Sequence, residues 1–184
     1  MELIESQYEN LIKELITIIK DKWTLANRSG EIYLKQLFEL FSEIYTNEEE
    51  EEAEDTISKT INYKKITLVN ECNSLFLKLN DLLTSFKVYL DRIEKIKTNL
   101  IYIIDSNLSS KQIMIDKNDF KLFTINLAES FAKDYLLKHK LITYFVSKSR
   151  FCTSSQVSLM SCWIHEPYLT SEVYLFKLNK YLLE

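Results

Sequence analysis

The side chains best suited to chemistry lie close together near the C-terminus of this chain. Cys162, His165 and Glu166 bring a thiol, an imidazole and a carboxyl group into one short stretch, and such groups bind zinc or activate nucleophiles. Structural zinc sites need two ligand pairs, whereas Cys162-x2-His165 has no clear second pair. A cysteine nucleophile needs donors for an oxyanion, and Glu166 has no evident partner for paired-carboxylate chemistry. We therefore predict no catalytic residues, no metal site, no cofactor and no enzymatic activity.

The same stretch, Ser161–Leu169, contains the only proline of the chain, one of its two tryptophans and one of its two histidines. Pro167 cannot donate a backbone hydrogen bond and disfavours helical geometry at the preceding residue, so a helix must end before it. We expect Trp163, His165, Pro167 and Tyr168 to form a structural corner that pins the last helix to the bundle. Direct contact of Trp163 or Tyr168 with a partner is the alternative.

The composition restricts the elements that can hold this corner in place. The chain has 184 residues, of which 46% are hydrophobic, with a single glycine and a single proline. Sheet-rich folds need more turn residues than this, and glycine-rich phosphate loops need several glycines. The sequence therefore predicts an all-α fold of long helices joined by polar connections.

Charge is unevenly distributed along the chain. Residues 1–56 carry 5 basic and 15 acidic side chains, for a net charge of −10, whereas residues 57–104 carry +4 and residues 105–184 carry +2. An acidic chain without a long basic run is not expected to bind nucleic acid directly. The sequence shows no signal-peptide pattern and no long apolar run, so we expect no membrane association. Three cysteines suggest a reducing compartment, the nucleus or the cytoplasm.

Residues 1–46 are predicted to form N-terminal helices. Apolar residues at helical spacing predict a first helix over Glu2–Ala26 and a second over Glu31–Tyr45. The only glycine lies in Asn27–Gly30, which predicts a break between the two helices, with Ser29 as the N-cap of the second. The acidic residues 47–56 then predict a solvated linker, and a docking site for a basic partner is the alternative.

The strongest pattern in the chain runs from residue 57 to residue 104. Apolar residues alternate steps of four and three, which predicts an elongated helical bundle with a long heptad-repeat (coiled-coil) helix. This heptad seam consists of Leu68, Cys72, Leu75, Leu79, Leu82, Phe86, Tyr89, Ile93, Ile96, Leu100 and Ile103. A parallel row, Val69, Phe76, Leu83 and Leu90, implies more than one neighbouring helix. The seam is expected to form the core of the bundle, to bind a second subunit, or to do both.

Residues 112–184 are predicted to form the C-terminal helices and to include the corner. One helix is expected over Asn118–Lys148, and Thr153 is a candidate N-cap for the next helix because Gln156 completes a capping box. After Pro167, a last helix is expected to begin at a cap formed by Thr170 or Ser171.

Four stretches in the same order resemble the cyclin-dependent kinase 2-interacting protein family, and the W-I-H-E-P-Y stretch is the most specific of them. They are Tyr8-Glu9-Asn10-Leu11-Ile12, Lys22-Trp23-Thr24-Leu25, Phe120 with Lys133-Asp134-Tyr135-Leu136-Leu137-Lys138, and Trp163-Ile164-His165-Glu166-Pro167-Tyr168. The acidic segment before a long heptad helix is also similar to that family. The chain departs from the family before Phe120, where Ile113–Asp116 replaces a lead-in that contains proline and tryptophan.

The resemblance implies a non-enzymatic helical adaptor. Members of the family are associated with cell-cycle kinases and replication checkpoint proteins. They also serve as accessory subunits of a AAA+ ATPase complex in ribosome maturation and in extraction of proteins from chromatin. Beside them sits a second small helical accessory subunit, for which the heptad seam would be the natural binding face. A cyclin-dependent kinase is a further expected partner.

Two other classes of protein fit the same pattern. A coiled-coil structural or tethering protein would use the heptads, although such proteins usually carry fewer aromatic residues than the 11 Tyr and 10 Phe found here. A helical bundle that associates with itself would bury the seam between copies.

Overall fold

A computed structural model describes residues 2–51, 58–107, 116–147 and 153–183. Every described residue except 116 and 166–170 is helical, and none lies in a strand. The predicted all-α helical bundle is therefore confirmed. Within the described ranges, no helix is both long and apolar enough to cross a membrane.

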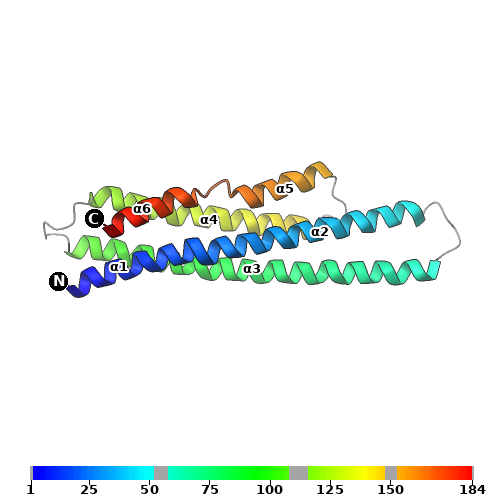
Figure 1. Cartoon of the computed structure of the whole chain (residues 1–184), viewed down its shortest axis with the longest axis horizontal. Coiled ribbons are helices and arrows are strands. Elements are labelled where there is room, and N and C mark those ends of the chain that lie inside the picture. Colours follow the sequence, from blue (N-terminus) through cyan, green and yellow to red (C-terminus); the bar gives the residue numbers. More distant parts are fainter. Residues whose placement is uncertain (1, 52–57, 108–115, 148–152, 184) are drawn as a thin grey trace.

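The described helices form four antiparallel legs (Figure 1). Their bounds are α1 Glu2–Thr17, η1 Ile18–Trp23, α2 Thr24–Glu51, α3 Ser58–Asn107, α4 Lys117–Ser147, α5 Thr153–His165 and α6 Ser171–Leu183. The first leg is α1, η1 and α2 without interruption, and the second and third legs are α3 and α4. The fourth leg is divided into α5 and α6, and both termini lie at the same end of the bundle.

The predicted break at Asn27–Gly30 is wrong, because α2 continues through it. Gly30 does not adopt a positive φ, and Ser29 Oγ donates to the carbonyl of Leu25 at 3.1 Å, as a residue in a helix interior does. A glycine in a helix interior costs only about 1 kcal/mol relative to alanine. Favourable packing on that glycine can therefore outweigh its tendency to end the helix.

The first leg changes its winding in η1, a six-residue π-helix. The hydroxyl of Thr24 donates to the carbonyl of Ile19, five residues earlier, at 2.9 Å. The wider turn places Ile18, Ile19 and Trp23 in the core together. Isolated π-helical turns often accompany functional sites, and this one positions the Trp23 indole.

The predicted linker over residues 47–56 is helical in its first half. Helix α2 runs to Glu51, so Glu48–Glu51 belong to its last turn, and glutamate is a good helix former. Residues 52–57 lie outside the described residues.

The long helix predicted over residues 57–104 is confirmed as α3, Ser58–Asn107. Its heptad seam is covered by the chain's own helices, since eight of the eleven residues are buried and Leu82, Tyr89 and Ile103 are half-buried. The physical reason is the missing break, because an uninterrupted first leg over residues 2–51 is as long as α3. The seam is therefore bundle core.

Candidate functional site

The corner between α5 and α6 is a tight turn with one strained residue. Glu166 follows the last residue of α5 with φ at 41°, in the left-handed region that non-glycine residues avoid. Its carbonyl accepts a hydrogen bond from the amide of Leu169 at 2.7 Å. The carbonyl of Thr170 accepts from the amide of Tyr174 at 3.0 Å, which places Thr170 at the N-cap position, one of the two predicted caps.

Trp163 fixes the end of α5 to the first leg. Its side chain is fully buried, and its indole Nε1 donates to the backbone carbonyl of Asn27 at 3.0 Å. The ring lies directly on the backbone at Gly30, where an added Cβ would be only 2.1 Å from ring atom Cζ2. The only glycine of the chain thus leaves the space that the Trp163 ring occupies.

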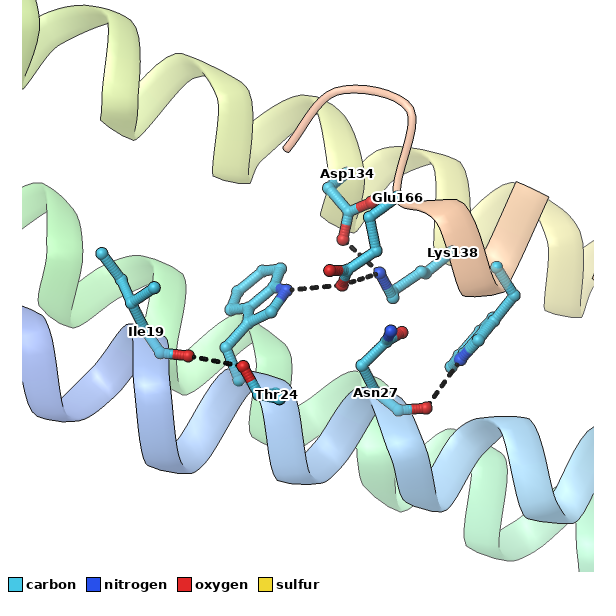
Figure 2. A network of polar contacts seen from close by, with 8 residues as sticks. Ile19, Thr24, Asn27, Asp134, Lys138 and Glu166 are labelled. Carbon is cyan, nitrogen blue, oxygen red and sulfur yellow. Dashed lines mark hydrogen bonds and ion pairs between the residues drawn. The ribbon is translucent and has the colours of Figure 1, made fainter. Parts of the chain in front are cut away.

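Glu166 is the centre of a buried polar network. Its Oε1 accepts from the indole Nε1 of Trp23 at 3.2 Å and from Nζ of Lys138 at 2.9 Å. Lys138 also forms an ion pair with Asp134, one turn earlier in α4. Figure 2 shows the Glu166 carboxylate pointing toward Lys138, with Asp134 beside them. The network joins η1, α4 and the α5–α6 corner.

The Lys138 ammonium group also lies among three aromatic rings. Its Nζ is 5.3 Å from the ring centroid of Phe86, 5.4 Å from Trp163 and 5.9 Å from Trp23. These distances allow cation–π attraction, which is strongest where water is excluded. Phe86 lies on α3, so the ammonium group contacts side chains from all four legs of the bundle.

The electrostatics of the network are unusual for a bundle core. Asp134 and Lys138 are fully buried, while the side chain of Glu166 is 16% exposed. Burial raises the pKa of Asp134 to about 6, and the charge of Glu166 adds to this effect while Lys138 opposes it. With both carboxylates ionised, one ammonium group faces two negative charges. A proton on Asp134 neutralises one of the two carboxylates and so removes the excess negative charge.

This arrangement is suited to holding helices together rather than to catalysis. A lysine nucleophile or a carboxylate general acid must touch a substrate, and Lys138 and Asp134 have no exposed surface. No group of three or more His, Cys, Asp or Glu residues is placed to hold a metal ion in the part of the chain that the structure describes.

The structure separates the four residues predicted for the corner. Trp163 is buried, whereas His165 and Pro167 are exposed and Tyr168 is 49% exposed. The expectation that His165 and Tyr168 pin the last helix is therefore wrong. Glu166 lies just beyond α5 with a left-handed φ, and its carboxylate reaches Trp23 and Lys138, whereas His165 stays exposed. Glu166, which lacks an obvious partner in the sequence, carries the polar contacts instead.

Sequence reasoning also missed Asp134 and Lys138. Both interrupt a stripe at core spacing, Phe131, Asp134, Lys138, Leu141 and Phe145, with steps of three, four, three and four. Charged residues at two successive core positions, four apart, indicate a buried ion pair. The spacing of Asp134 and Lys138 could therefore have indicated their pairing. Glu166, which completes the network, is distant from them in the sequence.

The stretches that carry the family resemblance meet in space. Trp23, Lys138 and Glu166 come from three of them, and Trp23 and Lys138 both donate to the carboxylate of Glu166. Tyr8 belongs to the remaining stretch, and Phe120 is the aromatic residue that accompanies Lys133–Lys138. The centroids of their rings are 5.7 Å apart. No family model and no curated protein matches this chain.

Proposed function

We propose that this chain is a non-enzymatic helical adaptor, an accessory subunit of a AAA+ ATPase complex. The complex acts in maturation of the large ribosomal subunit and in protein remodelling linked to chromatin and replication. The observation that carries this proposal is the mutual contact of Trp23, Lys138 and Glu166, each from a different stretch that resembles the cyclin-dependent kinase 2-interacting protein family.

Mutual contact makes the resemblance more specific. Short motifs scattered along a chain are weak indicators when each could arise alone. Here the Glu166 carboxylate needs the donors of Trp23 and Lys138, and Lys138 needs a carboxylate because a buried charge without a partner is costly. The residues of the separate matching stretches therefore depend on one another for their contacts in the folded chain. This dependence supports a relationship between the chain and that family.

The closed core supports a binding role. Asp134 and Lys138 are buried, and the Lys138 ammonium group lies among three aromatic rings, while long helical surfaces remain available to partners. A second helical subunit must use these outer surfaces, because the heptad seam is occupied within the chain. A cyclin-dependent kinase would likewise contact the outside of the bundle, in the nucleus or the cytoplasm.

The alternative of a two-stranded tether is less favoured by the packing. A parallel or antiparallel tether exposes its seam to a second chain, whereas the seam here is buried by the first leg and by α4. The seam residue Phe86 lies 4.7 Å from Trp23 between ring centroids, an aromatic contact typical of a globular core.

Reconstitution tests the proposal. We would co-express the full chain with the AAA+ ATPase and the small helical subunit of the same organism, and measure assembly by size-exclusion chromatography with light scattering. We expect a complex of defined mass that contains all three proteins. An unrelated four-helix bundle of similar size serves as the control for non-specific capture. A folded chain that binds neither protein would overturn the proposal.

A further inference from the structure

Two carboxyl groups in the buried network share the same hydrogen-bond donors. Nζ of Lys138 bonds to the carboxylates of both Asp134 and Glu166 (Figure 2). The indole Nε1 of Trp23 donates to Glu166 at 3.2 Å. Burial raises the pKa of Asp134, whereas the ammonium group of Lys138 and the indole N–H of Trp23 lower it. Both donors that hold Glu166 are therefore also within reach of Asp134.

These donors do not satisfy both carboxyl groups at once. Oε1 of Glu166 accepts from Trp23 and from Lys138. In contrast, Oδ1 of Asp134 is buried and has no hydrogen-bond partner among the described residues. A buried ionised oxygen without a donor is costly, and a proton on the carboxyl group removes most of this cost. The arrangement in the structure therefore suits a protonated Asp134.

The two carboxyl groups differ in their freedom to move. Asp134 lies in the interior of α4 and is fully buried. Glu166 follows the last residue of α5, and its side chain is 16% exposed. Its φ of 41° is unfavourable for a residue with a side chain, and a residue before proline prefers an extended conformation. Release of Glu166 into water therefore relaxes the backbone of the corner.

Each leg of the bundle also adds uncharged neighbours to the network. The rings of Phe86 in α3 and Trp163 in α5 face the ammonium group, and the amide of Asn27 in α2 lies beside it (Figure 2). In α6, the phenol of Tyr174 is bonded to Ser130 of α4 at 2.8 Å. The charged groups of the network are thus its two carboxyl groups and its one ammonium group.

The two histidines of the chain have to be separated from any effect of this network. His139 follows Lys138 in α4, His165 precedes Glu166, and both imidazoles are exposed. Histidines change charge between about pH 5 and pH 8. The tests below are therefore made on the wild-type chain and on a reference variant, His139→Gln with His165→Gln.

We infer that the α5–α6 corner is a pH-sensitive hinge, in which Asp134 and Glu166 exchange at their shared donors. At acid pH Asp134 is protonated, and Glu166 holds both donors as in the structure. At higher pH Asp134 releases its proton to solvent and takes both donors, while Glu166 turns into water and the corner relaxes. Helix α5 stays in place, because the indole of Trp163 bonds to a backbone carbonyl of α2 instead. The inference does not depend on the proposed function.

The proton determines the direction and the pH range of the exchange. In the arrangement of the structure, the pKa of Asp134 is about 6, mainly because of burial. Transfer of two donors to this carboxyl group stabilises its ionised form alone. The midpoint of the exchange is therefore expected at that pH or slightly below it.

The indole N–H groups allow the exchange to be followed by NMR. Trp23 and Trp163 are the only tryptophans of the chain, so each gives one assignable Nε1–H resonance. The Trp23 resonance is expected to move between two positions as the pH rises from acid to neutral. The Trp163 resonance should stay, because its acceptor is a backbone carbonyl. A fixed Trp23 resonance, or equal movement of both, overturns the inference.

Hydrogen exchange separates movement of the corner from titration of a fixed carboxyl group. The amide of Leu169 donates to the carbonyl of Glu166 at 2.7 Å, and this bond is lost when the corner relaxes. After correction for intrinsic exchange rates, its protection should fall about tenfold between acid and neutral pH. The amide of Tyr174, which donates to Thr170 at 3.0 Å, is the matched control. Unchanged protection of Leu169, or equal loss at both amides, overturns the inference.

Asp134→Asn shows whether this carboxyl group drives the change. Asparagine has nearly the same shape and cannot ionise, so the Trp23 resonance and the protection of Leu169 should keep their acid values at neutral pH. Circular dichroism checks that the variant is folded. A pH step that persists in the folded variant overturns the inference. If the variant does not fold, the wild-type chain and the histidine reference variant decide, and a step that disappears in the reference variant overturns it.

Discussion

At the scale of single residues, Gly30 and Trp163 depend on each other. The indole occupies the space in which any side chain at residue 30 would begin, and its Nε1 reaches the carbonyl of Asn27 in the same turn of α2. The fourth leg is thus attached to the first by a side chain that fits only against bare backbone. Glycine is required here for close approach and not for an unusual φ.

Gly30→Ala is expected to destabilise the protein. Alanine is about 1 kcal/mol better than glycine in an exposed helix interior, but overpacking of a core contact costs about 1–3 kcal/mol and more when the neighbour is rigid. The neighbour here is an indole ring held on its other side. We expect a net loss of about 2 kcal/mol in urea unfolding followed by tryptophan fluorescence. Ser29→Ala, one residue away, is the control, and a variant as stable as wild type would contradict this packing.

The pH dependence of stability should reveal the buried carboxyl of Asp134. Its pKa is about 6 in the folded protein, mainly because of burial, and about 3.9 when unfolded. The folded state therefore holds the proton more tightly. The stability due to this group is fully present below pH 4 and is lost as pH rises to about 6. We expect the unfolding free energy of wild type relative to Asp134→Asn to fall by about 3 kcal/mol over this window.

The matched variant for this experiment is Glu166→Gln. The charge of Glu166 is one of the causes that raise the pKa of Asp134, so its removal should lower that pKa and flatten the pH dependence. Carboxylates elsewhere, such as Glu14, whose pKa is lowered by its bond to Arg92, titrate alike in the compared proteins and cancel. If the unfolding free energies of Asp134→Asn and Glu166→Gln depend on pH as that of wild type does, Asp134 does not hold the proton.

At the scale of elements, the continuous first leg decides the role of α3. A leg of the same length as α3 can cover the whole heptad seam, whereas two shorter helices could not. The π-helical turn in this leg brings Trp23 to the network. The seam is thus part of the core that these legs enclose.

The seam cysteine provides a direct check of this packing. Cys72 is 4% exposed and burial raises the pKa of its thiol, so the reactive thiolate is scarce and shielded. Cys162 of α5 is half-buried. In native protein, alkylation followed by peptide mass spectrometry should therefore modify Cys162 well before Cys72. Equal rates would indicate that α3 opens to solvent or exchanges partners.

At the scale of the whole molecule, stability should differ between the body of the bundle and the end at which only α2 and α3 remain. Four legs surround the network, whereas α2 and α3 extend beyond α4 and α5 at one end (Figure 1). Local opening is easiest where few apolar contacts must be broken.

Hydrogen exchange measures this difference. At low protein concentration, amides of residues 63–69 in α3 should exchange much faster than those of residues 79–100, which lie in the body of the bundle. Uniform protection along α3 would contradict the expected difference.

The sequence by itself determined the helical class, the long α3 and the ends of most helices. These features depend on local properties, namely the scarcity of glycine and proline, the unbroken heptad steps and the position of Pro167.

Only the tertiary structure decided what Gly30, Asp134, Lys138 and Glu166 do. Gly30 looks like a helix break until Trp163, distant in sequence, is placed on it. A charged residue looks solvated until its partners enclose it, and here those partners come from separate legs. Contacts between legs also extend α2 through the predicted break, and this extension places the seam inside the molecule. Such outcomes arise from free energies shared among residues far apart in the chain, which local patterns do not contain.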